Sequence, residues 1–288
     1  MIVDVKNYNK TEIVSIGDRI FQGKFFLHSK FKRVTNFSNG NSVLSIVTEE
    51  IGKGPVNIVV EGMDVANIND LYISKNFISI NYKKYPFDKR KLFNSQIKFK
   101  KINTNRLKKN LIYFEKTLLD LSHPKSIAFL INSDRKKYFI TAFERNFLER
   151  IKEGVYNIFN NNLIYGIKKV KGVGFGLTPS GDDFISGLII ALYVFDNIYC
   201  NNTKYEKLRK LIYKITKGEN LLSNSFLSLS KDGFMPERIK KLIISILYES
   251  EKEIFNQIKN LLLIGETSGS DLGVGFLLTI KNGGILCF

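Results

Sequence analysis

The stretch that organises this sequence is residues 172–192, which read GVGFGLTPSGDDFISGLIIAL. Three glycines alternate at its start: Gly172, Gly174 and Gly176. A helix is predicted directly after them, because Thr178-Pro179-Ser180 is typical of a helix start, and Ser180 and Asp183 have the spacing of a capping box. Apolar residues then follow at helical intervals. The stretch therefore predicts a glycine-rich loop that leads into a buried helix.

A second stretch near the C-terminus, residues 265–280, repeats this pattern as GETSGSDLGVGFLLTI. Four pairs of identical residues align: Ser180/Ser268, Gly181/Gly269, Asp183/Asp271 and Gly187/Gly275. The last pair lies inside the predicted helices, where a glycine costs about 1 kcal/mol relative to alanine. A packing reason is therefore expected, and we predict that the two helices cross closely at these glycines.

The duplicated segment suits a small ligand. A helix N-terminus carries free N–H groups and about half a positive charge, which favours an anion. If the two copies pack together, both helix starts face one cleft and form a two-sided site for a small polar or anionic molecule. The candidate binding residues are Gly174, Gly176, Thr178, Ser180, Gly181, Asp182, Asp183, Thr267, Ser268, Gly269 and Asp271.

Asp182 complicates an anion site, because its charge would repel a phosphate unless a cation bridges them. The alternatives are Mg²⁺ held by Asp182 and Asp183, a nearby lysine within residues 168–171, or an amide or ammonium group on the ligand itself. No Gly-Lys-Ser/Thr follows the glycines, so the stretch is not a P-loop. A purely structural reading is also open, in which both acidic residues only complement the helix dipoles.

Outside these two motifs, the spacing of hydrophobic residues changes once along the chain, from the pattern of short strands to that of helices. Short strands are predicted at residues 25–28, 30–37, 43–48, 56–61, 71–74, 77–82 and 96–101, with a tight hairpin at Asn39-Gly40. Helices are predicted from residue 105 to 121 and at 133–150, 205–217, 236–247 and 251–263, with capping boxes or caps at Ser133-Asp134 and at Ser250 and Glu253. This order predicts an α+β fold: a β-rich barrel or sandwich over residues 1–103, then a mostly helical domain over residues 104–288 that carries both motifs.

Composition narrows the function classes. The 288 residues carry 44 basic and 27 acidic side chains, and between Lys75 and Lys137 there are 17 basic against 4 acidic residues. This segment mixes cations with aromatic rings, so nucleic-acid binding is one alternative. Only 9 of the basic residues are arginine, however, and base reading favours arginine, so a solvated basic face or one that attracts an acidic partner is the stronger interpretation.

The sequence disfavours three classes of protein: membrane-spanning proteins, disulfide-stabilised proteins and proteins with a histidine-ligated metal. The longest nearly apolar run, Phe184 to Phe195, holds 12 residues, whereas a membrane span needs about 20. No secretory signal is expected in the first thirty residues, so we predict a cytoplasmic protein. Two cysteines, Cys200 and Cys287, and two histidines, His28 and His123, form no disulfide framework and no metal-ligand spacing.

Residues 172–192 closely resemble the G-x-G-x-G-L-T-P-S-G-D-D signature of the AllH-like family, which is otherwise catalogued as a domain of unknown function. The C-terminal TSGSDLGVGFLL resembles the family's second signature, and residues 28–60 resemble its opening, including Arg33, Asn36 and the Gly52-Lys53-Gly54-Pro55 turn. Two positions depart from the pattern: Phe175 stands where the family usually has proline, and Glu266-Thr267 where it often has His-Ser.

The resemblance implies a subunit of oxamate carbamoyltransferase, a transferase of purine (allantoin) degradation or related nitrogen metabolism that works with partner subunits. The reaction would pass a carbamoyl group from carbamoyl phosphate to oxamate, giving oxalurate and phosphate. Arg33, Asn36 and Glu266 become secondary site candidates on this basis. The acceptor stays open, as does a non-catalytic scaffold or regulatory role, and the residues single out no nucleophile, because positioning and electrostatics can suffice for this chemistry.

Overall fold

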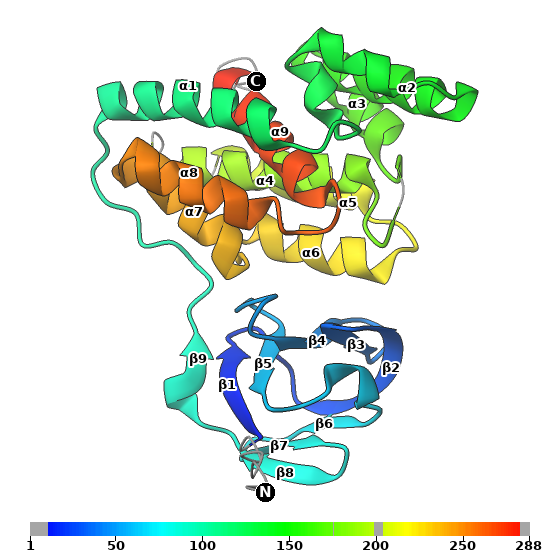
Figure 1. Cartoon of the computed structure of the whole chain (residues 1–288), viewed down its shortest axis with the longest axis vertical. Coiled ribbons are helices and arrows are strands. Elements are labelled where there is room, and N and C mark those ends of the chain that lie inside the picture. The colour runs from blue at the N-terminus through cyan, green and yellow to red at the C-terminus, as the bar shows by residue number, and fades with distance from the viewer. Residues whose placement is uncertain (1–10, 175, 199–203, 283–288) are drawn as a thin grey trace, which may run out of the picture. The chain divides into compact units, whose positions relative to one another are not determined.

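The computed structural model describes residues 11–174, 176–198 and 204–282 (Figure 1). The chain packs as two compact units, one ending at Ser95 and the other beginning at Gln96, and each has its own hydrophobic core. A curled half-barrel sheet is followed by a mostly helical region, with 53% of residues in helices and 17% in strands, which confirms the predicted α+β class. The predicted domain boundary at residues 103 and 104 stays a prediction.

The first unit is built on one nine-stranded sheet with the order β8-β7-β6-β2-β3-β4-β5-β1-β9. The strands are β1 (Glu12–Gly17), β2 (Gly23–Phe31), β3 (Val34–Ser38), β4 (Val43–Thr48), β5 (Asn57–Glu61), β6 (Leu71–Ile73), β7 (Phe77–Ile80), β8 (Lys83–Pro86) and β9 (Leu92–Phe93). Neighbouring strands pair antiparallel except β4 with β5 and β1 with β9. One face of the curled sheet encloses a core of Ile, Leu, Val and Phe side chains.

The predicted hairpin at Asn39-Gly40 is confirmed between β3 and β4. Gly40 has φ +89°, and the Asn39 side chain accepts hydrogen bonds from the N–H groups of Asn41 and Ser42. This turn chemistry pairs Ser38 with Val43 and sets the register of the two strands.

Three strand predictions need correction. The predicted strand 30–37 is two strands, because Phe31 pairs with Val34 and the chain turns at Lys32-Arg33. Residues 96–101 form no strand: Ile97 and Phe99 pack into the core of the helical unit, which accounts for their alternation. The strand Glu12–Gly17 was absent from the prediction, and it pairs between β5 and β9.

The second unit is helical. Its α-helices in the described residues are α1 (Thr104–Leu121), α2 (Ala142–Phe159), α3 (Leu163–Val170), α4 (Ser180–Ile198), α5 (Lys204–Thr216), α6 (Leu221–Lys231), α7 (Glu237–Tyr248), α8 (Glu251–Leu261) and α9 (Ser268–Asn282). Short 3₁₀ helices, Ile127–Leu130 and Ser133–Tyr138, lie between α1 and α2. None of the described helices is long and apolar enough to cross a membrane.

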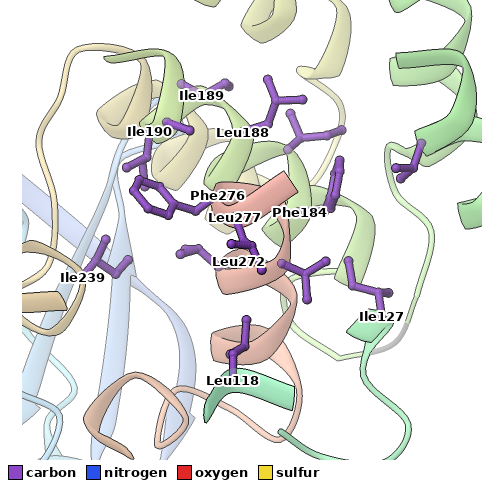
Figure 2. Close-up of a cluster of buried hydrophobic side chains, with 14 of the residues drawn as sticks. Leu118, Ile127, Phe184, Leu188, Ile189, Ile190, Ile239, Leu272, Phe276 and Leu277 are labelled. Atoms are coloured by element: carbon purple, nitrogen blue, oxygen red, sulfur yellow. The ribbon is translucent and has the colours of Figure 1, made fainter. Parts of the chain in front are cut away.

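Helix α4 is the centre of this unit. Every residue from Ser180 to Leu192 is buried, so the helix is covered on all sides. Its main partner is α9, drawn in red in Figure 1, and side chains of both helices meet in the apolar cluster of Figure 2. A Cβ atom at Gly187 would overlap the carbonyl oxygen of Leu272, and one at Gly275 would overlap that of Phe184. The predicted close crossing at the two glycines is therefore confirmed.

Two helix predictions are wrong at their starts. The helix predicted from Ser133 begins instead at Ala142, because Thr141 and Glu144 form a complete capping box there. The capping box predicted at Ser250 is absent: Ser250 precedes α8 but makes no capping hydrogen bond, and the Glu253 side chain accepts from Gln257. Helices α3 and α6 were not predicted.

Candidate functional site

The two loop-to-helix segments have the same local geometry. The N–H of Gly181 donates to Val173 O at 2.8 Å, and the N–H of Gly269 donates to Ile264 O at 3.0 Å. A Cβ atom at either glycine would overlap a backbone carbonyl at the end of the preceding helix, α3 or α8. The duplicated sequence is therefore a duplicated structure, in which each helix start is packed directly onto the helix before it.

The residues that start the helices differ from the predicted caps. Asp183 N donates to Pro179 O at 3.1 Å and Asp271 N donates to Thr267 O at 2.9 Å, so Pro179 and Thr267 precede the first turns. Ser180 and Ser268 lie just inside their helices instead of capping them. The predicted Ser180–Asp183 capping box is thus corrected, and both serine hydroxyls are available to the opposite copy.

The structure brings the two motifs together. Thr178 Oγ1 donates to Asp183 Oδ2 at 3.2 Å and lies 3.4 Å from Ser268 Oγ of the other copy. The arrangement is reciprocal, since the Ser268 hydroxyl faces the carboxyl of Asp183 while the hydroxyls of Ser180 and Thr267 face that of Asp271. Two aspartates, two serines and two threonines from segments about ninety positions apart therefore form one cluster.

The residues of this cluster become less exposed to solvent from Gly176 and Glu266 toward the two aspartates. Gly176 and Glu266 are exposed, Thr178, Thr267 and Ser268 are half-buried, and the two aspartates are buried. Asp183 is 4% exposed and Asp271 0% exposed. The hydroxyl groups therefore lie between solvent and a pair of carboxyl groups.

Burial raises the pKa of both carboxyl groups. The pKa of Asp271 rises to about 6, although the hydrogen bond from the Ile127 N–H and the nearby hydroxyls of Ser180 and Thr267 oppose the shift. The pKa of Asp183 rises well above its ordinary value, mainly through burial and also through repulsion from Asp271 and Asp182. Two carboxyl groups in one buried cluster resist simultaneous ionisation, so the pair favours a state with a single negative charge.

The helix starts are less open to anions than the sequence suggested. The N–H groups of Gly181 and Gly269 bond to the loop carbonyls described above, and Asp182 N donates to Pro179 O at 2.9 Å. These backbone donors are therefore already engaged. The polar groups that the cluster presents are therefore mainly side-chain hydroxyls and carboxyls.

Asp182 and two of the nearby lysines have other partners. Asp182 Oδ1 accepts a hydrogen bond from Gly172 N at 2.8 Å and so closes the glycine loop. Lys169 pairs with Glu153, and Lys171 Nζ donates to Ile215 O. Among the described residues, no three His, Cys, Asp or Glu side chains gather as a metal site would require.

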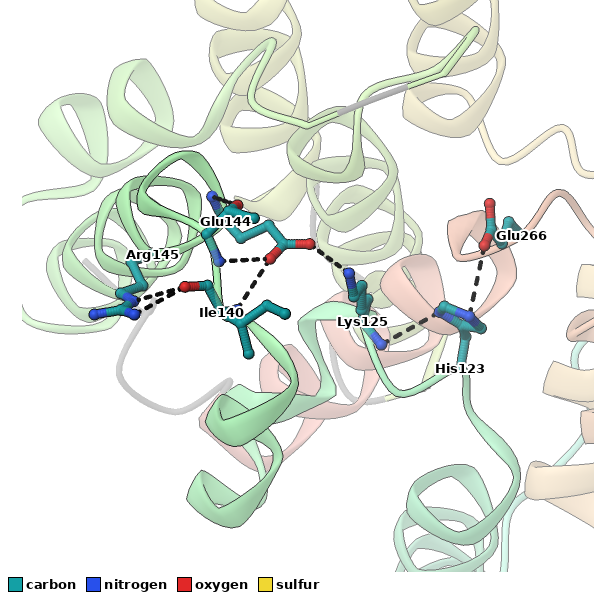
Figure 3. A network of polar contacts seen from close by, with 7 residues as sticks. His123, Lys125, Ile140, Glu144, Arg145 and Glu266 are labelled. Atoms are coloured by element: carbon teal, nitrogen blue, oxygen red, sulfur yellow. Dashed lines mark hydrogen bonds and ion pairs between the residues drawn. The ribbon is translucent and has the colours of Figure 1, made fainter.

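The segment that follows α1 contributes groups that sequence reasoning missed. Ile127 N donates to Asp271 Oδ1 at 2.8 Å, and His123 Nε2 lies 3.5 Å from Glu266 Oε1 (Figure 3). Arg135 holds this segment in place by donating to the carbonyls of Ser122 and His123. In the sequence, Ser122-His123-Pro124 indicates only the end of the predicted helix 105–121.

The remaining candidates belong to the first unit. Arg33 and Asn36 belong to the strand unit, where Arg33 pairs with Glu50 and Asn36 hydrogen-bonds Ser29 and Ser45. Their part in a shared site stays a prediction. Phe175, Cys200 and Cys287 lie outside the described residues.

The comparison with known families agrees with the motif pair. The family described as "Oxamate carbamoyltransferase subunit AllH" matches residues 170–280, which run from the end of α3 through most of α9. The predicted resemblance to this family is therefore confirmed over the segment that contains both motifs. No solved structure matches the chain.

Proposed function

We propose that this chain is a subunit of a carbamoyltransferase-type enzyme, in which the clustered motifs bind a small anionic or amide substrate. The reaction is transfer of a carbamoyl group from carbamoyl phosphate to oxamate or a similar acceptor, in the cytoplasm and together with partner subunits. The family match over residues 170–280 supports the reaction class.

The observation that carries the proposal is the reciprocal contact between the copies. Thr178 and Ser268, from opposite motifs, approach to 3.4 Å, and each buried aspartate faces a serine of the other motif. Helix capping alone requires no such crossing, because a cap acts on its own helix. Polar groups that converge from two elements onto buried carboxyls are typical of a binding site.

An imidazole also stands beside this cluster. Glu266 occupies the position where the resembled family often has histidine, and His123 from the segment after α1 lies 3.5 Å from it. We propose that His123 and Glu266 together border the substrate site at its exposed side. In this arrangement the segment after α1, and not residue 266 itself, supplies the imidazole.

The test is carbamoyl transfer by the assembly reconstituted with its partner subunits. Asp183→Asn should reduce turnover at least 100-fold while the variant still folds and assembles. A matched control is Asp196→Asn, which removes a partly buried carboxyl on the same helix that pairs with Arg209, about 20 Å along the axis from Asp183. Activity of Asp183→Asn that falls only as far as in the control would contradict the proposed site.

One observation favours a second candidate, a non-catalytic scaffold or regulatory subunit. The pattern shared by the two copies also serves packing, because Gly187 and Gly275 bring α4 and α9 into backbone contact. A scaffold predicts that Asp183→Asn leaves turnover per assembled complex unchanged and alters only assembly, which sedimentation of the reconstituted complex measures.

A further inference from the structure

The two buried aspartates have unequal hydrogen bonding. Asp183 accepts a hydrogen bond from the Thr178 hydroxyl, and the Ser268 hydroxyl also faces its carboxyl. Asp271 receives the Ile127 N–H on Oδ1, whereas its Oδ2 has no hydrogen-bond partner among the described residues. The Ser180 and Thr267 hydroxyls face this carboxyl and stabilise its charge, yet neither reaches hydrogen-bonding geometry with Oδ2.

A buried carboxylate oxygen without a hydrogen-bond partner destabilises the folded state, because it has lost its hydrogen bonds to water and no protein donor replaces them. Asp271 is 0% exposed, and the residues that face its carboxyl are the motif residues of both copies. Such an oxygen is an acceptor for an N–H or O–H donor that the protein itself does not supply.

The negative charge of the cluster determines which kind of ligand could supply this hydrogen-bond donor. The titratable groups around Asp271 are Asp183 and Asp182 on α4, with His123 and Glu266 toward the exposed side. A phosphate or carboxylate placed against the buried aspartates would be repelled, and the N–H groups of Gly181, Asp182 and Gly269 are engaged. A neutral primary amide offers N–H donors and a carbonyl acceptor together, which complements a carboxylate flanked by hydroxyl groups.

Resting on the proposed function, we infer that Asp271 is a specificity-determining residue whose free Oδ2 accepts an N–H bond from the carboxamide end of the substrate. The carbonyl oxygen then lies toward Thr178 and Ser268, and the Thr178 hydroxyl turns from Asp183 to donate to it. The anionic end of the same molecule lies toward the exposed side of the cluster. Carbamoyl phosphate and oxamate both carry such an H₂N–C=O end, so the inference concerns the chemistry that they share.

The experiment compares oxamate with oxalate, in which a second carboxylate replaces the amide at nearly the same size. Calorimetry on the full chain at pH 7.5 should show oxamate binding at least 10-fold more tightly than oxalate. Asp271→Asn should weaken oxamate at least 10-fold and remove most of the preference, since an amide NH₂ then opposes the ligand NH₂. Asp196→Asn serves as the folding control and should keep the preference.

Equal affinities for oxamate and oxalate, or an unchanged preference in Asp271→Asn, would overturn the inference. The proposed function would survive that result if Thr178→Val still weakened both ligands, because the site would then exist with a different selectivity. Absence of oxamate binding to the wild-type chain also overturns the inference, while the turnover test with Asp183→Asn decides the proposed function separately.

Discussion

Replacing Asp271 by asparagine should change the pH dependence of stability in a defined direction. Burial raises the pKa of this carboxyl from about 3.8 in the unfolded chain to about 6 in the folded protein. Between these values the folded state retains a proton that the unfolded state has released. Raising the pH through this window therefore favours unfolding of the wild-type protein. One pKa unit corresponds to about 1.4 kcal/mol, so the loss amounts to about 3 kcal/mol by pH 7.5.

Asp271→Asn lacks this titration. Its free energy of unfolding, relative to wild type, should therefore rise by about 3 kcal/mol between pH 3.5 and pH 7.5, most of it between pH 4 and pH 6.5. The variant also relieves the repulsion on Asp183, which acts in the same direction. The absolute offset depends on how the new NH₂ group is satisfied, but the change with pH does not.

Urea unfolding at closely spaced pH values measures this difference. Glu144→Gln is the control of opposite sign, because the Lys125 hydrogen bond and the Thr141 N–H lower the pKa of Glu144 to about 2. Its loss of stability relative to wild type should be constant above about pH 4.5 and should shrink as the pH falls from 4.5 toward 2. A flat Asp271→Asn difference between pH 4 and pH 6.5, or one that falls, would refute the assignment of a buried carboxyl with a raised pKa.

Two further predictions follow from the packing and the charge. Gly187→Ala should prevent stable folding of the helical unit, since its Cβ would overlap the Leu272 carbonyl, whereas Gly218→Ala meets nothing closer than 3.8 Å and should leave the melting temperature nearly unchanged. Similar melting temperatures for both variants would contradict the close crossing. Binding to a single-stranded oligonucleotide should be weak and lost by about 0.2 M salt, because lysines such as Lys109 and Lys125 are paired with acidic residues. Submicromolar affinity at that salt would instead favour the nucleic-acid alternative.

Turns and helix ends were predictable from the sequence where neighbouring residues alone determine them. The Asn39-Gly40 turn needs only the dihedral freedom of glycine and the short polar side chain of asparagine, so it was predicted with its hairpin. Residues 96–101 were mistaken for a strand because alternation reports which side chains are buried and not what buries them; Ile97 and Phe99 pack against helices. The start of α2 was misplaced because two cap signals competed and the more complete one, at Thr141, prevailed.

The sequence by itself determined that two Ser-Gly-x-Asp segments start buried helices and that glycines inside those helices allow them to touch, because both follow from residue type and spacing. Only the tertiary structure decided what the crossing brings together. Contact at Gly187 and Gly275 places Ser268 against Asp183 and Ser180 toward Asp271, and the chain after α1 adds the Ile127 N–H and His123. Burial of a carboxyl, and hence its protonation, depends on neighbours from distant positions, which no local pattern encodes.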